Sequence, residues 1–169
     1  MRSSVNSLIS DELLVPALGE SLTRSGKTLV TAESCTGGWI AKLVTDLPGS
    51  SQWFERGFVT YSNAAKVEML GVNPVTIAAH GAVSEATVSE MALGALTHSR
   101  GDFSVAVSGV AGPGGGSAEK PVGTVWIAWA NDGQVSARQY LFTGERDEIR
   151  YAAVLEALRG VLERVSAGF

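Results

Sequence analysis

Ser34 is the residue whose surroundings best suit covalent chemistry. It lies in the segment TAESCTGG, after the apolar run Thr28 to Ala32 and before a glycine pair and an apolar-periodic stretch. This order is typical of a strand, a tight turn and a helix, and it places the hydroxyl near the carboxyl edge of a sheet, where α/β folds bind ligands. Backbone N–H groups from Cys35 to Gly38 could stabilise an oxyanion there. Ser34 or Thr36 could equally well cap the helix.

A serine hydroxyl needs a base to become a nucleophile, and this base is usually a histidine. The chain has only two histidines, His80 and His98. Both histidines are placed as surface residues, His98 near a helix C-terminus. The segment YSNAAK offers a better pair, since Tyr61 ends an expected strand and Lys66 lies in the turn or helix start that follows. A lysine desolvated in a pocket loses its proton more readily and can act as a general base. A solvated lysine and a strand-end tyrosine are the commoner alternative.

Cys35 is the rival nucleophile, because a thiolate at a helix N-terminus has a lowered pKa. A buried structural cysteine is the usual alternative. Cys35 is also the only cysteine, which excludes an intramolecular disulfide and a cysteine-based zinc cluster and suits a reducing cytosol. Because no His, Cys or carboxylate cluster has convincing metal-ligand spacing, we expect neither a catalytic metal nor a cofactor.

The elements that must position these residues follow from hydrophobic periodicity and turn residues. Helices are expected over Asp11 to about Arg24 with Asp11 as cap, Trp39 to Leu47, Ala64 to Leu70 after Ser62 or Asn63, Glu85 to Ser99 after Ser84, and about Asp147 to Val165 after Thr143. Strands are expected over Thr28 to Ala32, Phe54 to Tyr61, Asp102 to Gly112, and in a hairpin of GTVWIAWA and QVSARQYLF around Asn131-Asp132-Gly133. The sequence therefore predicts a three-layer α/β/α fold with a mixed, mostly parallel sheet of about five strands.

Length and charge narrow the class of protein. A chain of 169 residues suits a single domain, here 1–169 with a core over about 11–165. A net charge of −4 opposes general binding to nucleic acid. Since there is no uncharged run long enough to span a bilayer and no secretory signal pattern at the N-terminus, we expect a cytoplasmic protein with no membrane partner.

Several motifs occur in an order that resembles one known family. TAESCTGGW, WFERGFVTYSNAAK, LGV with GAVSEATVSEMALGAL, SGVAGPGGGSAEKPVGTVW and GERDEIR are similar to segments of the CinA C-terminal domain family, over about Leu13 to Leu162. The resemblance implies a three-layer fold and a nicotinamide-nucleotide amidohydrolase, which converts nicotinamide mononucleotide and water to nicotinate mononucleotide and ammonia in pyridine-nucleotide salvage. It implies Ser34 as nucleophile, Tyr61 and Lys66 as supporting residues, and a homodimer as the usual assembly.

The same resemblance directs attention to groups for the substrate's phosphate and ribose. The loop Gly112 to Lys120 is rich in glycine, so its backbone could approach an anion, although it lacks a P-loop ending and could be a flexible surface loop. Arg146 and Arg150 are spaced i, i+4 and either could bind phosphate, with Arg146 favoured because it lies nearer the helix start; a surface salt-bridged pair is the alternative. Glu33 could bind ribose or orient Lys66. The expected substrate-binding residues are Glu33, Cys35, Thr36, Gly37, Gly38, Ser108, Gly112, Gly114, Gly115, Arg146 and Arg150. Thr124 is a further polar candidate. For Glu33, Thr36, Ser108 and Thr124, a hydrogen bond within the fold is an equally good alternative to substrate binding.

Two other functions stay open at this point. One is a noncatalytic module that binds a nucleotide or a sugar phosphate, since a fold and its pocket can persist without turnover. The other is an amidohydrolase that acts on a related small anionic amide.

Overall fold

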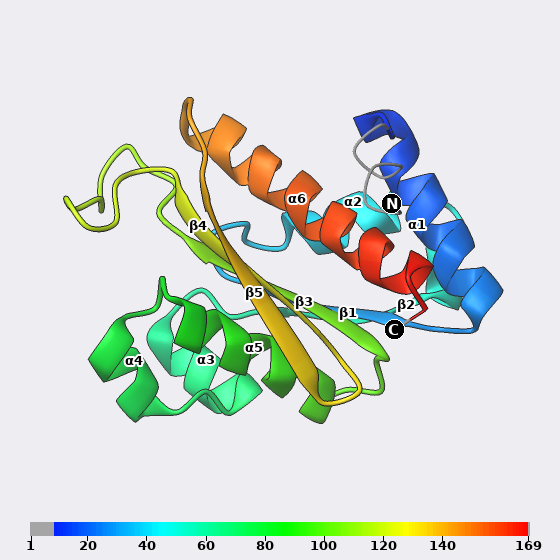
Figure 1. The fold of residues 1–169 in the computed structure, drawn as a ribbon, viewed down its shortest axis with the longest axis horizontal. Coiled ribbons are helices and arrows are strands. Elements are labelled where there is room, and N and C mark those ends of the chain that lie inside the picture. The colour runs from blue at the N-terminus through cyan, green and yellow to red at the C-terminus, as the bar shows by residue number, and fades with distance from the viewer. Residues whose placement is uncertain (1–8, 169) are drawn as a thin grey trace.

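A mixed five-stranded sheet forms the centre of the computed structural model, which describes residues 9–168 (Figure 1). Its strands are β1 (Leu29–Glu33), β2 (Phe54–Val59), β3 (Phe103–Gly109), β4 (Thr124–Asn131) and β5 (Gln134–Leu141), in the spatial order β2-β1-β3-β4-β5. β1 pairs in parallel with β2 and β3, whereas the β3–β4 and β4–β5 pairs are antiparallel. The predicted α/β class and strand number are confirmed. The expectation of a mostly parallel sheet is inexact, because two of the four strand pairs are parallel and two are antiparallel.

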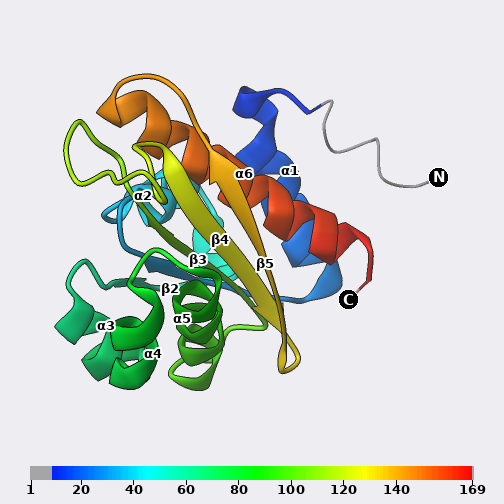
Figure 2. The same ribbon diagram turned by 60° about the vertical axis from the view of Figure 1, so that its left-hand side comes forward.

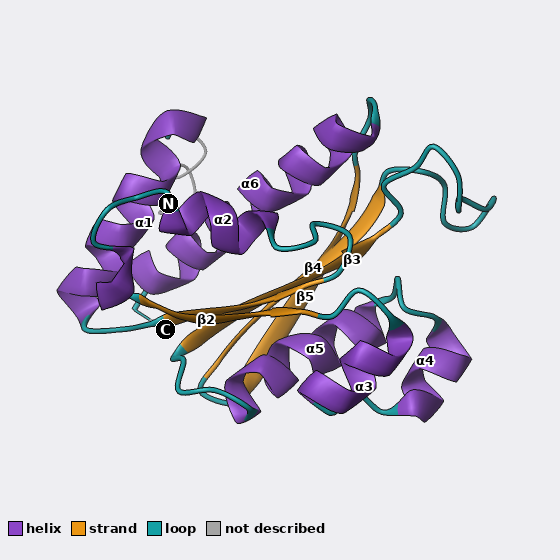
Figure 3. Cartoon of the chain, turned by 180° about the vertical axis from the view of Figure 1, so that it is seen from behind, coloured by secondary structure: helices purple, strands orange, loops and turns teal. Residues whose placement is uncertain are grey.

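Helices cover both faces of this sheet, as Figures 2 and 3 show. One face carries α1 (Asp11–Ser25), α2 (Trp39–Thr45) and α6 (Arg146–Ser166), and the other carries α3 (Asn63–Leu70), α4 (Pro74–His80) and α5 (Glu85–Thr97). A short 3₁₀ helix, Ser50–Gln52, leads into β2. No helix within residues 9–168 is both long and apolar enough to cross a membrane.

The central strand β1 shows why the layers form. All five of its residues are buried, and successive side chains point to opposite faces. Leu29 packs in the cluster formed with α1 and α6, whereas Val30 and Ala32 pack in the cluster formed with α5. A strand buried on both faces reads as a continuous apolar run, which is the pattern that predicted it.

Two predicted helix caps are confirmed and two are wrong. Ser62 accepts a hydrogen bond from the Ala65 amide at 3.0 Å, and Ser84 accepts one from the Thr87 amide at 3.2 Å. Asp11 is the first residue of α1 and not its cap, since Ser10 takes that position. Thr143 does not cap α6 either. Glu145 occupies that N-cap, and the Glu148 carboxylate accepts its amide at 2.7 Å, which starts the helix earlier than predicted.

Helix α4 was not predicted from the sequence. None of its residues is buried, so it carries no apolar stripe from which periodicity could find it. The signal that was present is the pair Asn73-Pro74: the Asn73 side chain accepts the Val75 amide at 2.9 Å, and Pro74 occupies the first turn. α4 matters for the site because the connection that follows it, through Ala82 and Val83, reaches the pocket.

The parallel part of the sheet brings three chain segments to one edge. β1, β2 and β3 run in the same direction, so their carboxyl ends lie together. Ser34 follows β1, Thr60 and Tyr61 follow β2, and Ser108 and Gly109 end β3. The predicted functional segments therefore converge there even though they are far apart in the sequence.

Candidate active site

An open pocket of about 290 Å³ lies at this edge of the sheet. Its lining comes from the ends of β1, β2 and β3, the start of α3, the α4–α5 connection, the glycine-rich loop and the start of α6. The lining residues are Ser34, Cys35, Tyr61, Asn63, Lys66, Ala82, Val83, Ser108, Gly109, Val110, Ala111, Gly112, Gly114, Gly115 and Arg146. The pocket thus gathers most of the expected site residues; those outside its lining are Glu33, Thr36, Gly37, Gly38 and Arg150.

Ser34 and Lys66 are in direct contact inside this pocket. Lys66 Nζ donates to Ser34 Oγ at 2.9 Å and to the Thr60 carbonyl at 2.8 Å, and it lies 3.4 Å from the Tyr61 carbonyl. The contact arises because Ser62 caps α3 directly after β2, which places Lys66 in the first turns of the helix, facing β1. The sequence offered Lys66 as a base toward Ser34, with a solvated lysine as the alternative, and the fold brings the two residues together.

The Lys66 amine is held in surroundings that favour its neutral form. Its side chain is only 1% exposed, and burial lowers the pKa of Lys66 below that of a solvated lysine. No ion pair to Lys66 forms among the described residues. A neutral amine has two N–H donors and one lone pair. In the neutral form, with both N–H groups directed at the carbonyls of Thr60 and Tyr61, the direction of the Ser34 contact reverses: the Ser34 hydroxyl donates and the Lys66 lone pair accepts.

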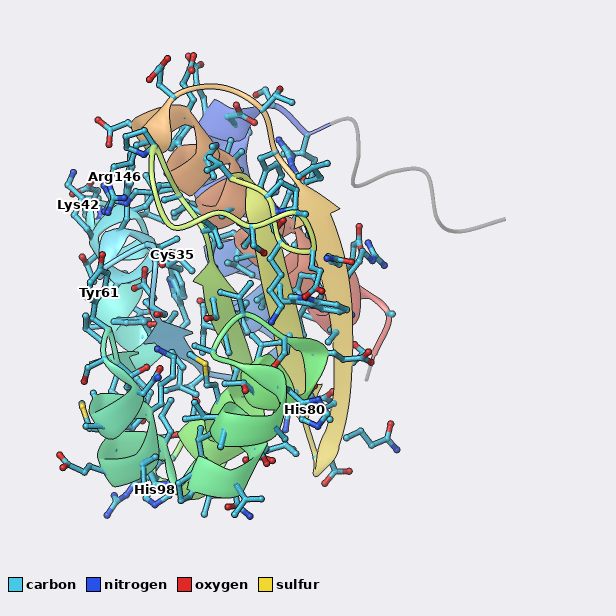
Figure 4. The ribbon with its side chains drawn as sticks, turned by 90° about the vertical axis from the view of Figure 1, so that its left-hand side faces the viewer. Cys35, Lys42, Tyr61, His80, His98 and Arg146 are labelled. Atoms are coloured by element: carbon cyan, nitrogen blue, oxygen red, sulfur yellow. The ribbon has the colours of Figure 1, made fainter. Side chains whose placement is uncertain are left out.

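Tyr61 contacts Lys66 through its backbone carbonyl and not through its phenol. The side chain is 62% exposed and reaches across the pocket mouth, where the Tyr61 hydroxyl accepts a hydrogen bond from Arg146 Nη2 at 3.4 Å. Figure 4 shows Tyr61 and Arg146 on the same side of the molecule as Cys35. The support that the resemblance assigns to Tyr61 therefore does not come from a hydrogen bond between its hydroxyl and the Lys66 amine in this arrangement.

The turn after Ser34 leaves three amides without an acceptor among the described residues. The Ser34 amide donates to the Val107 carbonyl and the Gly37 amide to the Ser34 carbonyl, each at 3.0 Å. Gly37 and Gly38 have φ values of 59° and 99°, which a residue with a Cβ rarely adopts. Among residues 9–168, the Cys35, Thr36 and Gly38 amides donate to no oxygen. Free N–H groups next to a nucleophile suit an oxyanion.

Glu33 caps α2 and does not face the pocket. The Glu33 carboxylate accepts the Thr36 hydroxyl at 2.7 Å and the amides of Ile40 and Ala41 at 2.8 and 3.0 Å. Its expected contact with ribose or with Lys66 is therefore wrong for this structure. The reading of Ser34 or Thr36 as the cap of α2 is also wrong, because neither hydroxyl accepts an amide of that helix. A carboxylate at a helix N-terminus is favoured by the exposed amides and by the helix dipole.

The two arginines at the start of α6 differ in what they touch. Arg146 lines the pocket, and its Nη1 donates to the Gly112 carbonyl at 2.6 Å. Arg150 instead donates from Nε to the Cys35 carbonyl at 3.0 Å and from Nη2 to the Thr36 carbonyl at 3.2 Å. The alternative of surface salt bridges holds in part for Arg150, whose Nη1 lies 3.4 Å from the Asp147 carboxylate, but Arg146 forms no ion pair among residues 9–168. Only Arg146 is placed to meet an anion in the pocket.

The thiol of Cys35 lines the pocket beside Ser34 but is electrostatically unsuited to attack. Desolvation by burial raises the pKa of Cys35 to about 11, and the nearby Arg150 and Lys66 only partly oppose that rise. The idea of a thiolate activated at a helix N-terminus is therefore contradicted, since the pKa moves in the opposite direction. A neutral thiol at this position is a weak nucleophile.

The hydroxyls of the remaining polar candidates, Ser108 and Thr124, donate hydrogen bonds to backbone carbonyls of the protein. Ser108 lines the pocket, but its hydroxyl donates to the Ala82 carbonyl at 2.8 Å. Thr124 lies outside the lining, with its hydroxyl on the Pro121 carbonyl at 2.7 Å. Neither histidine lines the pocket, and His98 lies at the end of α5 far from Cys35 (Figure 4). Within the described part of the chain, no group of three His, Cys, Asp or Glu residues could hold a metal ion.

Several pocket residues could not be found from the sequence. Asn63 was considered only as a helix cap, and Ala82 and Val83 carry no chemical signal of their own. In the fold all three residues line the pocket. Lys120 is a further case: its Nζ donates to the His80 carbonyl at 2.8 Å and so fastens the end of the glycine-rich loop to α4.

Comparison with known proteins gives a consistent set of relatives. The model of a family described as the CinA C-terminal domain matches residues 11–165. A nicotinamide-nucleotide amidohydrolase, PncC, from Escherichia coli K12 is 57% identical over 143 residues, which cover 84% of this chain and 87% of that protein. The crystal structure of a competence/damage inducible protein, CihA, from Agrobacterium tumefaciens is 48% identical, covers 92% of this chain and 94% of its own, and superposes with a TM-score of 0.88. A CinA superfamily protein from Klebsiella pneumoniae, 38% identical, covers 94% of this chain and 99% of its own with a TM-score of 0.90.

Proposed function

The chain belongs to the CinA C-terminal domain family, and on that premise we propose that it hydrolyses the carboxamide of nicotinamide mononucleotide, with Ser34 as nucleophile and Lys66 as base. The observation that carries the proposal is the 2.9 Å contact between Ser34 Oγ and the buried Lys66 amine. A serine hydroxyl is inert without a base, and a desolvated lysine supplies one close to neutral pH. The amidohydrolase relatives support the choice of an amide as substrate.

The first half-reaction forms an ester on Ser34. The Lys66 lone pair accepts the Ser34 proton, and the oxygen attacks the carboxamide carbon. The free amides of Cys35 and Thr36 are near enough in the chain to stabilise the oxyanion, and such a donor is typically worth about 10²–10³ in turnover. Protonated Lys66 then gives its proton to the leaving nitrogen, so that ammonia departs and the acyl group of nicotinate mononucleotide is left esterified to Ser34 Oγ.

The second half-reaction uses the same groups in reverse. Lys66 accepts a proton from water, hydroxide attacks the ester, and the proton returns to Ser34 Oγ as nicotinate mononucleotide leaves. The Thr60 and Tyr61 carbonyls hold the amine in place through both halves, since each can accept from it whichever protonation state it carries. We assign the supporting role of Tyr61 to this carbonyl and to the hydroxyl that meets Arg146 at the pocket mouth.

The rest of the pocket suits a ring and a phosphate. Ala82 and Val83 form an apolar wall that fits the flat pyridine ring. At the other side, Arg146 and the backbone of Gly112, Gly114 and Gly115 offer a guanidinium and open amides to an anion. The phosphate would bind across the pocket from the serine turn, so the carboxamide would be directed toward Ser34.

The test is ammonia release from three amides that differ only in the substituent on the pyridine nitrogen. We expect rapid release from nicotinamide mononucleotide, much slower release from nicotinamide riboside, which lacks the phosphate, and slower release still from nicotinamide. Equal rates on all three would remove the phosphate from the proposal. Binding of the mononucleotide by folded protein without any ammonia would instead indicate a noncatalytic nucleotide-binding module.

A further inference from the structure

Arg150 holds the turn that carries the nucleophile from outside the pocket. Its guanidinium donates to two consecutive carbonyls of that turn, Cys35 at 3.0 Å and Thr36 at 3.2 Å. It also lies over the Trp39 ring, 5.2 Å from the centroid, and 3.4 Å from Asp147. The side chain is only 25% exposed and is not part of the pocket lining. These contacts occupy the fork of the guanidinium, so it is poorly placed to bind substrate.

A carbonyl held in place also fixes the amide on the other side of the same peptide bond. The peptide unit is planar and trans, so its C=O and N–H point in opposite directions. The Cys35 carbonyl directed at Arg150 therefore turns the Thr36 N–H away from α6, and that N–H has no protein acceptor within residues 9–168. The Thr36 carbonyl directed at Arg150 turns the Gly37 N–H back toward the Ser34 carbonyl, which it meets at 3.0 Å. A cation on the carbonyl also polarises the peptide and strengthens its N–H as a donor.

Glu33 restrains the same turn from the opposite side. Its buried carboxylate accepts the Thr36 hydroxyl at 2.7 Å and the first free amides of α2. Thr36 is thus held by its side chain on Glu33 and by its carbonyl on Arg150. With both contacts in place the peptide between Cys35 and Thr36 cannot rotate without losing a charge-assisted hydrogen bond.

We propose that Arg150 is a positioning residue which, with Glu33, sets the orientation of the Thr36 amide so that it can stabilise the oxyanion on the substrate bound at Ser34. The proposal rests on the amidohydrolase function proposed above. It separates the roles of the two arginines: Arg146 binds the substrate's phosphate, whereas Arg150 acts through the backbone of the turn. Loss of Arg150 should therefore lower kcat and leave KM nearly unchanged.

The kinetic test compares Arg150→Gln with Arg150→Lys and with Arg159→Gln. Arg159 is the matched control, because it lies on the same helix but contacts Ile9, Asp11 and Glu156, far from the turn. We expect Arg150→Gln to lower kcat by about 10²–10³, the usual effect of losing an oxyanion donor, with KM within about threefold. Arg150→Lys should recover part of the rate, since a lysine can reach one of the two carbonyls. Arg159→Gln should keep the wild-type kcat. A raised KM with unchanged kcat in Arg150→Gln would overturn the proposal in favour of direct phosphate binding.

A second measurement does not depend on turnover. Hydrogen exchange of the Gly37 amide, followed by NMR, reports whether the turn is held, because that amide is bonded to the Ser34 carbonyl. We expect exchange at least tenfold faster in Arg150→Gln than in Arg159→Gln or the wild type. Unchanged exchange would overturn the proposal even with an active enzyme. A wild type that releases no ammonia, together with faster exchange in Arg150→Gln, would contradict the proposed function and leave the hold of Arg150 on the turn intact.

Discussion

The pocket is bounded by two glycine-containing segments that the chain builds in different ways. The turn from Ser34 to Gly38 follows β1, is largely buried, and is held at several points by Glu33 and Arg150. The loop from Gly112 to Pro121 follows β3, is mostly exposed, and is fastened at its two ends by Arg146 on the Gly112 carbonyl and by Lys120 on the His80 carbonyl. Both segments leave the carboxyl edge of adjacent parallel strands.

The difference in restraint fits the different tasks that we propose for the two segments. An oxyanion must meet donors that are already in place, because any reorganisation adds to the barrier. A phosphate makes many alternative contacts and tolerates a backbone that adjusts. Changes in the turn should therefore alter kcat, and changes in the loop or at Arg146 should alter KM.

The largest effect should come from Lys66, beside the turn. Lys66→Met is expected to lower kcat by about 10²–10⁴, the usual contribution of a general base. The same change should make the protein more stable at neutral pH, because burial holds the pKa of Lys66 down and the fold must keep the amine neutral. This gain in stability should be full below the lowered pKa and absent above that of a solvated lysine. Ammonia release and urea denaturation at several pH values would check both.

Lys120→Met is the matched control, since it removes a lysine from the end of the loop. It should leave kcat unchanged and raise KM by no more than a few-fold. A loss of kcat comparable to that of Lys66→Met would contradict the division of tasks between the two segments.

The next largest effect should be on substrate affinity, through Arg146. Arg146→Gln removes the guanidinium that lines the pocket and contacts the Gly112 carbonyl. A charge-assisted hydrogen bond to an anion contributes about 1.5–3 kcal/mol, so KM for nicotinamide mononucleotide should rise by about 10–100-fold with a small change in kcat. For nicotinamide riboside, which lacks the phosphate, KM should change little. An equal rise in KM for both substrates would contradict the assignment of Arg146 to the phosphate.

The pH profile should report the base directly. Lys66 must be neutral to accept the serine proton, so kcat/KM should rise by about tenfold per pH unit until the pH passes its pKa. Because burial lowers that pKa, the plateau should be reached below the range of a solvated lysine. The loop variant Lys120→Met should show the same profile. If kcat/KM instead falls as the pH rises through this range, the essential group must be protonated, and Lys66 would be excluded as the base.

The smallest effect separates the backbones of the two segments. Gly37 has φ of 59° and faces Arg150, whereas Gly114 lies in the loop with open space where a Cβ would go. Gly37→Ala should lower the free energy of unfolding by about 1–2 kcal/mol and reduce kcat as well. Gly114→Ala should change stability by less than about 0.5 kcal/mol. Chemical denaturation of both variants would reveal the difference, and equal stabilities would show that the turn is no more constrained than the loop.

The sequence predicted the parts of this picture that depend on neighbouring residues. Alternation and turn residues located the strands, and the apolar run before Ser34 was enough to place it at a strand end. The family motifs paired Ser34 with Lys66, and the sheet order brings them together. The three-layer class followed from the alternation of helices with strands.

What the sequence did not predict depends on how distant elements pack. Arg150 was considered a phosphate ligand because it lies near Arg146, but α6 crosses the serine turn so that Arg150 meets carbonyls 114 and 115 residues away. Glu33 follows Ala32 on a buried strand and could be assigned to the helix start only once α2 was placed above it. Neither periodicity nor motif spacing contains that information.

The most direct test of the account is ammonia release from nicotinamide mononucleotide by chelator-treated wild type, Ser34→Ala and Cys35→Ala proteins. Ser34 Oγ contacts the Lys66 amine, whereas burial raises the pKa of the neighbouring Cys35 to about 11. We therefore expect Ser34→Ala to lose at least about 10³-fold in turnover and Cys35→Ala to stay within about tenfold of the wild type. Loss of activity in Cys35→Ala with retention in Ser34→Ala would contradict the serine–lysine mechanism.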